Sequence, residues 1–204
     1  PHSSWLPACR RLLLLLPALV LAAGLSARSL VKADVQLANN AVLAMYQDED
    51  ANMWIGTYDG LHLYNGKNTF VFRMELDNEF SLCSNIVLEI APAEKGYLWV
   101  ATSLGINKFS LRERRVVESY MQYVDVENIA SDSEGNTVLF SGEDFITCYR
   151  PGRAFFEDVY IPGVRAAEIV AVWSEAPRVF CTLGRDGELV RYRLNDGEGK
   201  SLVR

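Results

Sequence analysis

Short runs of apolar and aromatic residues alternate with polar turns along most of this chain. In residues 47–65 (QDEDANMWIGTYDGLHLYN), two such runs flank the turn residues Tyr58, Asp59 and Gly60. Glycine takes the positive φ that a tight turn requires at no steric cost, so the stretch predicts a β-hairpin. No long segment has a helical period. The chain is therefore predicted to be all-β.

The hairpin recurs at a regular spacing. Trp99 follows Trp54 by 45 residues, and Thr102 follows Thr57 by the same 45 residues. Weaker copies place Val138 and Val179 at the tryptophan position, the latter before Asp186-Gly187. A period of about 40–45 residues with strand–turn–strand content is typical of β-propeller blades. One such sheet cannot bury both faces alone, so the units are expected to stack.

The pattern predicts four four-stranded antiparallel sheets, which form part of a larger propeller ring. The expected blades are residues 39–83, 84–124, 125–163 and 164–204. In the first blade, strands are expected at 42–46, 53–57, 61–64 and 69–73, and the same order repeats in the other three.

The residues that define the repeat have a structural interpretation, because a ligand would not require the same residue once per blade. Trp54 and Trp99 are expected to pack between adjacent blades. The turns are expected to use hydroxyl groups bonded to nearby backbone and glycines with positive φ. The hydroxyls are those of Thr57, Thr102, Ser141 and Thr182, and the glycines are Gly60, Gly105 and Gly187.

The N-terminus resembles a targeting segment rather than part of the fold. Arg10 and Arg11 precede an apolar run at residues 12–25, followed by small residues. A membrane span needs about 20 apolar residues, so a secretory signal peptide at 1–27 is favoured over a membrane anchor. Residues 28–38 are then a lead-in segment, and the remainder is exported. The chain starts with Pro1 and is interpreted as a fragment of a longer protein.

Composition limits the remaining classes of function. The 204 residues are 50% hydrophobic and carry a net charge of −6, which argues against a nucleic-acid surface. Of the four cysteines, Cys9 lies in the signal peptide, and no CxxC motif supports a zinc or redox site. Buried free thiols are expected for the others, with one disulfide as the alternative.

The sequence contains little that indicates catalysis. There is no G-x-S-x-G motif and no phosphate-binding glycine loop, and the only histidines are His2 and His62. His62 lies in a strand pattern, where a lone histidine is more often structural than a base. Four acids are interpreted as solvated turns without a calcium motif: Asp48, Asp50, Asp132 and Glu134. No catalytic residue, metal or cofactor is expected.

The pattern N-x-V-x4-Q-D-x5-W-I-G-T-x-D-G-L-x2-Y-N at residues 40–65 resembles the two-component regulator propeller repeat. A second copy spans 85–109, and the third and fourth have lost the tryptophan. The resemblance covers about residues 39–193. It implies the exported, periplasmic N-terminal sensor region of a Bacteroidetes hybrid histidine kinase, with seven-bladed propellers, a later membrane span and a kinase region. No kinase motif is present in this sequence.

The resemblance also implies partners. They are an oligosaccharide or other small polar ligand, and the C-terminal blades and kinase region of the same protein. A homodimer stays an open alternative. Two other functions also stay open, a propeller glycan lyase or hydrolase and a protein-binding scaffold.

Propeller ligands usually contact the loops that enter the inner strand and those that join the second strand to the third. The candidate ligand-binding residues are Asn40, Tyr58, Asp59, Asn85 and Ser103, with Glu127 and Asn128 in the third blade. Asn and Asp can hydrogen-bond hydroxyl groups, and tyrosine offers an amphipathic face to a sugar ring. The alternative is that Asn40, Asn85 and Asn128 only cap the start of a strand, because recurrence at one repeat position indicates structure.

Four blades of a larger ring would leave two blade faces without a neighbour. Such faces expose apolar area that a soluble monomer normally hides. We therefore expect the isolated chain to associate or aggregate, which size-exclusion chromatography with light scattering would detect. A monodisperse monomer that melts cooperatively would contradict the fragment interpretation.

Overall fold

The structure is a computed structural model that describes residues 35–120, 126–141, 145–153, 155–159, 165–195 and 202–203. The predicted signal peptide and residues 28–34 lie outside the described residues. Within the described part, no helix has the length and apolar character needed to cross a membrane.

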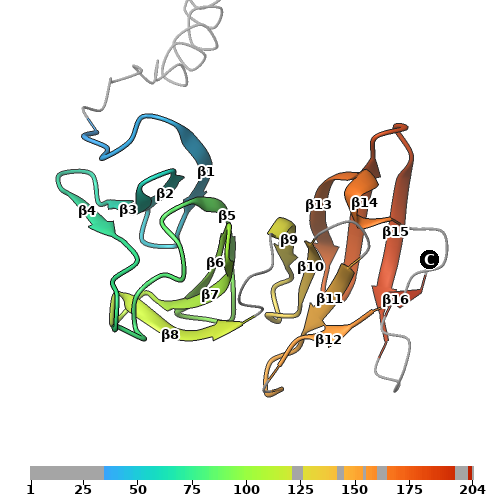
Figure 1. The fold of residues 1–204 in the computed structure, drawn as a ribbon. Coiled ribbons are helices and arrows are strands. Elements are labelled where there is room, and N and C mark those ends of the chain that lie inside the picture. Colours follow the sequence, from blue (N-terminus) through green and yellow to red (C-terminus); the bar gives the residue numbers. More distant parts are fainter. Residues whose placement is uncertain are drawn as a thin grey trace, which may run out of the picture. The chain divides into compact units, whose positions relative to one another are not determined.

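The described chain forms four antiparallel sheets, and in each one neighbouring strands follow one another in sequence (Figure 1). This confirms the predicted all-β architecture of four-stranded propeller blades. The first sheet contains β1 (Val42–Gln47), β2 (Met53–Thr57), β3 (Gly60–Tyr64) and β4 (Thr69–Phe72). The second contains β5 (Val87–Pro92), β6 (Tyr97–Thr102), β7 (Gly105–Ser110) and β8 (Arg115–Tyr120). The third contains β9 (Val126–Ser131), β10 (Thr137–Ser141), β11 (Phe145–Tyr149) and β12 (Glu157–Asp158). The fourth contains β13 (Ile169–Ala176), β14 (Val179–Gly184), β15 (Leu189–Leu194) and β16 (Leu202–Val203).

The hairpin between β2 and β3 has the tight turn that the sequence predicts. Thr57 pairs with Gly60, which leaves a loop of Tyr58 and Asp59. Gly60 has a φ of +104°, and a Cβ atom there would lie 2.4 Å from the carbonyl oxygen of Phe72. Any larger residue would strain the backbone and collide with β4, so glycine is required at this turn.

The first strand of every sheet has a β-bulge near its start. The residue that the register skips is Leu43 in β1, Leu88 in β5, Glu127 in β9 and Val170 in β13. A bulge locally increases twist and redirects the strand. Because the bulge recurs, it aligns the four sheets residue by residue.

This alignment corrects the fourth copy of the repeat. Trp54, Trp99, Val138 and Cys181 pair with equivalent positions of their first strands, namely Tyr46, Ala91, Ala130 and Trp173. The assignment of Val179 to the tryptophan position is therefore wrong by two residues. The reason is that β14 continues two residues past Thr182, to Gly184, which pairs with Ile169 as Thr57 pairs with Val42.

The same shift changes the predicted hydroxyl positions. Thr57 Oγ1 donates to Gly60 O at 3.2 Å, and Thr102 Oγ1 donates to Gly105 O at 2.9 Å. Gly184 occupies this position in the fourth sheet, so Thr182 does not serve the hairpin. Its hydroxyl group, like that of Ser141, is buried without a hydrogen-bond partner. The prediction of a hairpin role for Ser141 and Thr182 is therefore wrong.

Three apolar cores lie between consecutive sheets. The first joins the first and second sheets and contains Ala44, Trp54, Leu61, Leu63, Leu82, Val87, Ile90, Leu98, Val100, Phe109 and Val116. The second joins the second and third sheets, with Ala91, Trp99, Ala101, Ile106, Val126, Ile129, Leu139 and Tyr149. The third joins the third and fourth sheets, with Ala130, Val138, Phe140, Ile146, Cys148, Val159, Ala166, Ile169, Phe180, Tyr192 and Leu194.

The two tryptophans pack against the sheet that follows their own. The Trp54 ring meets Phe109 of β7 edge to face, with ring centroids 5.4 Å apart. The Trp99 ring meets Tyr149 of β11 at 4.9 Å, and its Nε1 donates to Thr137 Oγ1 of β10 at 2.8 Å. Each indole is therefore buried and also makes an edge-to-face ring contact with the next sheet.

The first two sheets approach each other closely at Gly56. A Cβ atom on Gly56 in β2 would lie 2.7 Å from Val87 Cγ1 in β5. The spacing between these sheets therefore leaves no room for a side chain at this position.

One acidic turn is more buried than the sequence suggests. Asp132 is only 5% exposed and accepts hydrogen bonds from Asn136 and from the backbone nitrogen of Arg178 in the fourth sheet. The interpretation of Asp132 as a solvated turn residue is therefore wrong, because its carboxylate satisfies buried backbone donors.

Replacing Trp99 by alanine should destabilise the protein by about 3–5 kcal/mol, because the change leaves a cavity between two sheets. The exposed Trp173 on the outer face of the fourth sheet is the matched control, and its replacement should cost about 1 kcal/mol or less. Denaturant unfolding of both variants measures the difference. Equal losses would show that the interface does not depend on the Trp99 indole.

Candidate functional site

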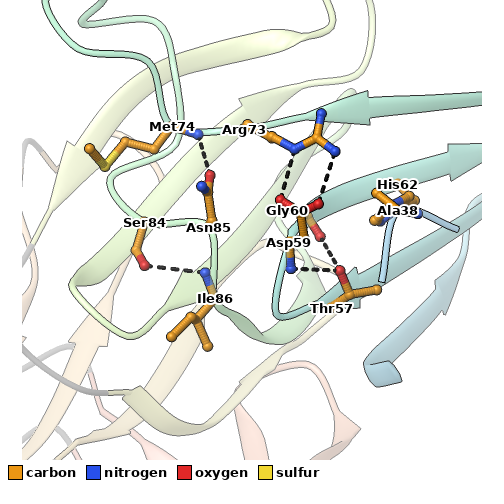
Figure 2. A network of polar contacts seen from close by, with 10 residues as sticks. All are labelled: Ala38, Thr57, Asp59, Gly60, His62, Arg73, Met74, Ser84, Asn85 and Ile86. Carbon is orange, nitrogen blue, oxygen red and sulfur yellow. Dashed lines mark hydrogen bonds and ion pairs between the residues drawn. The ribbon is translucent and has the colours of Figure 1, made fainter. Parts of the chain in front are cut away.

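Tyr58 and Asp59 project from the β2–β3 hairpin, at one end of the strands of the first sheet (Figure 2 shows Asp59). Tyr58 is 52% exposed. Asp59 makes a two-pronged ion pair with Arg73, which follows β4, with Nε–Oδ1 at 2.9 Å and Nη2–Oδ2 at 3.0 Å. The hydrogen bonds and charge of Arg73 hold the pKa of Asp59 below its usual range, so the carboxylate is ionised and oriented.

Asn85 connects this hairpin to the start of the second sheet. Its backbone oxygen accepts a hydrogen bond from Gly60 N at 2.8 Å, and its Oδ1 accepts one from Met74 N at 2.7 Å. Both contacts are to backbone, as expected for a residue that caps a strand. The side-chain Nδ2 has no protein partner among the described residues and is available as a donor.

Ser103 continues the same edge into the second sheet. Its backbone nitrogen donates to Ile86 O at 3.0 Å, and its hydroxyl group lies 2.9 Å from that of Ser84. Ser84 Oγ in turn accepts from Ile86 N at 3.2 Å (Figure 2). Asp59, Asn85 and Ser103 therefore lie along one hydrogen-bonded rim at this end of the strands, which we call the polar edge.

The structure does not join the other predicted residues to the polar edge. Asn40 is exposed before β1, and its backbone oxygen accepts from Val42 N at 3.1 Å. Asn128 lies inside β9, where it pairs with Phe140, and its Nδ2 donates to Ile169 O at 3.3 Å. Asn128 is thus not the counterpart of Asn40 and Asn85, so that assignment is wrong. Glu127 is the bulge residue of β9.

His62 is fully buried in β3, at 0% exposure. Its Nε2 accepts a hydrogen bond from the backbone nitrogen of Ala38 at 3.0 Å. In the second sheet, Asn107 occupies the equivalent position, and its Oδ1 accepts from Cys83 N at 3.1 Å. Both residues hold the segment that leads into the first strand of their sheet, which we call the entering segment. His62 is therefore a structural acceptor.

Burial lowers the pKa of His62, because the charged imidazolium would lose its hydration. The nearby charge of Arg73 acts in the same direction, whereas Asp59 and the carbonyl groups of Ile55 and Gly60 oppose it. The neutral imidazole is also the form that can accept the Ala38 N–H on Nε2.

The polar edge offers hydrogen-bonding groups. Within the described ranges, no serine, threonine or cysteine hydrogen-bonds to an imidazole, and no three His, Cys, Asp or Glu side chains group closely enough to hold a metal ion. An ionised carboxylate, an amide donor and an exposed phenol ring are suited to hydrogen bonding and stacking with a polar ligand.

Sequence reasoning missed Arg73 and Ser84. Arg73 directly follows the outer strand pattern, and nothing in its local sequence indicates a contact with a turn fourteen residues earlier. Ser84 next to Asn85 carries a weak signal, because hydroxyl groups often cap strand starts. Pockets of about 560, 530, 440 and 330 Å³ in the described part of the chain are lined by neither Tyr58 nor Asp59.

These sheets define the chain as a set of propeller blades. The model of the family described as "Two component regulator propeller" matches residues 36–59, so this segment is similar to the repeat of that family. No curated protein matches the sequence.

Solved propellers share the fold. The extracellular domain of BT3049 from B. thetaiotaomicron, described as a hybrid two component system, aligns with a TM-score of 0.64 and 19% identity over 86% of this chain. The corresponding domain of BT4673 from the same organism has a TM-score of 0.62 and 16% identity over 82% of this chain. PorZ, a surface component of the type-IX secretion system of Porphyromonas gingivalis, has a TM-score of 0.60 and 12% identity over 81% of this chain. This chain spans 26%, 24% and 22% of those structures, respectively.

The buried His62 should make stability depend on pH. Its lowered pKa means that its contribution is complete above about pH 6.5 and is lost as the pH falls below that value, because the unfolded chain then binds a proton that the folded chain resists. His62→Asn, which copies Asn107 of the second sheet, should remove this part of the slope between pH 7 and 5.

Urea unfolding of wild type and variant at several pH values checks this. Burial raises the pKa of Glu89, which gives a slope of opposite sign, but Glu89 is present in both proteins and cancels in the difference. Parallel pH profiles would contradict the role assigned to His62.

Proposed function

We propose that this chain is the ligand-sensing propeller region of an exported two-component sensor and that it detects an oligosaccharide or a similar small polar ligand. The polar edge carries the proposal. Tyr58 is exposed beside a carboxylate that Arg73 holds in place, and Asn85 offers a free amide donor. A fixed carboxylate and amide recognise hydroxyl groups, and a tyrosine ring packs against the apolar face of a sugar.

The repeat supports the sensor class. The matched family is described as a two-component regulator propeller, and two of the similar structures are extracellular domains of proteins described as two component systems. We infer that the chain acts outside the cytoplasm and that a kinase region of the same protein transmits the signal.

Tyr58→Ala and Asp59→Ala should each weaken saturable binding of the cognate glycan by about tenfold, because each removes one contact worth roughly 1–1.5 kcal/mol. Calorimetric titration of the full protein with a glycan panel measures this, and product analysis after incubation tests for cleavage.

The matched controls are Tyr64→Ala and Asp50→Ala. Tyr64 ends β3 and Asp50 lies in the β1–β2 turn, so both are at the opposite end of the strands of the same sheet. The controls should bind as wild type does. If the two edge variants fold normally and also bind as wild type does, the site assignment is wrong. Turnover of the glycan would overturn the sensor proposal in favour of an enzyme.

A further inference from the structure

A pocket of about 560 Å³ lies at the fourth sheet, at the same type of edge as the polar edge. It is bounded by the β14–β15 hairpin and by the entering segment with the 3-10 turn η1 (Ala166–Glu168), which precedes β13. The lining residues include Ile169, Thr182, Val190 and Tyr192. This volume lies within the range of small-molecule sites.

The sequence of this edge differs from its counterparts in an informative way. At the position of Thr182, the other three sheets carry the aliphatic residues Ile55, Val100 and Leu139. At the position of Val190, the first two sheets carry the polar acceptors His62 and Asn107. Polar and apolar residues have therefore exchanged places across this strand pair.

The exchange has a physical consequence. Val190 has no side-chain acceptor, so it cannot hold the entering segment as His62 holds Ala38. Arg165, the counterpart of Ala38 four residues before the strand, lies at the rim of the pocket. In the first sheet, the backbone at Ala38 lies over β3. At the fourth sheet, the pocket takes the corresponding place.

Thr182 places an unused polar atom in the wall of this pocket. The residue is 1% exposed, and its Oγ1 is buried without a hydrogen-bond partner. A buried hydroxyl group without a partner costs free energy that an aliphatic residue would avoid. Because Thr182 lines the pocket, we take a ligand group bound there as the partner of this hydroxyl group.

The rim is preformed and not positively charged. Arg185 donates from its backbone nitrogen to Glu168 O at 2.8 Å and from Nε to Ala167 O at 3.1 Å, which fixes the hairpin to η1. Glu188 N donates to Asp186 Oδ1 at 2.8 Å. The lining holds two arginines against three carboxylates, so an anionic ligand gains no net attraction.

We propose that this pocket binds a neutral, polyhydroxylated molecule of mono- to disaccharide size, with the Thr182 hydroxyl group bonding a ligand hydroxyl. Ile169, Val190 and Tyr192 supply the apolar wall against which the carbon face of a sugar ring packs. The inference rests on the proposed sensing function and assigns it a second binding site, separate from the polar edge.

The test is a titration of the full chain with glucose, maltose, cellobiose and glucuronate, followed by calorimetry and saturation-transfer NMR. We expect at least one neutral sugar to bind saturably and glucuronate to bind more weakly. Thr182→Val should weaken that binding about tenfold, while the melting temperature stays equal or rises because an unpartnered hydroxyl group is removed.

Thr182→Ser keeps the hydroxyl group and should restore binding to within about threefold of wild type. Thr57→Val is the matched control: its hydroxyl group serves a hairpin, so the melting temperature should fall and binding in the pocket should not change. Loss of sugar binding in Thr182→Val alone supports the pocket. Loss of sugar binding in Tyr58→Ala alone places the sugar at the polar edge and counts against the pocket. No neutral sugar binding, or unchanged binding in Thr182→Val, overturns the inference.

Discussion

The structure depends on apolar packing between consecutive sheets. In the first three sheets, nearly every described residue of the second and third strands is buried, as in β7, where every residue is buried. A single four-stranded sheet could not shield these residues, so each blade requires its neighbours. Trp54 and Trp99 concentrate this dependence, because each indole belongs to one sheet and contacts aromatic rings of the next. The outer faces of the first and fourth sheets carry the exposed side chains of Met45 and Leu189.

Close packing of the sheets limits which residues and loop lengths can vary at the hairpin ends of the strands. The strand register repeats through a bulge at the same position in all four sheets, so equivalent residues occupy equivalent surroundings. In the first two sheets, a buried acceptor on the third strand holds the entering segment by one backbone hydrogen bond. Such a contact gives a hydrogen-bond partner to a side-chain acceptor that would otherwise be buried alone. The chemical diversity of the edge therefore comes from loop length and from exchanges at these few positions.

Two edges illustrate this. At the first sheet, a short hairpin uses the Thr57 hydroxyl group internally and presents Tyr58 and Asp59 outward. At the fourth sheet, Gly184 takes the position of Thr57, and Thr182, whose hydroxyl group is buried without a hydrogen-bond partner, lines a pocket. One scaffold can thus present different polar groups without changing its core, as expected when function resides in sites placed on a repeated fold.

The sequence by itself determined the fold class, the four-sheet repeat and most strand positions, because alternation and turn residues act locally and recur with the tryptophans. It also placed Asp59, Asn85 and Ser103 on one kind of edge. Only the tertiary structure decided the register of the fourth copy, the contact of Arg73 with Asp59, and the positions of Asn128 and Thr182. Those features depend on which residues pair across strands and on loop length, and pairing between distant segments leaves no periodic signal in the sequence.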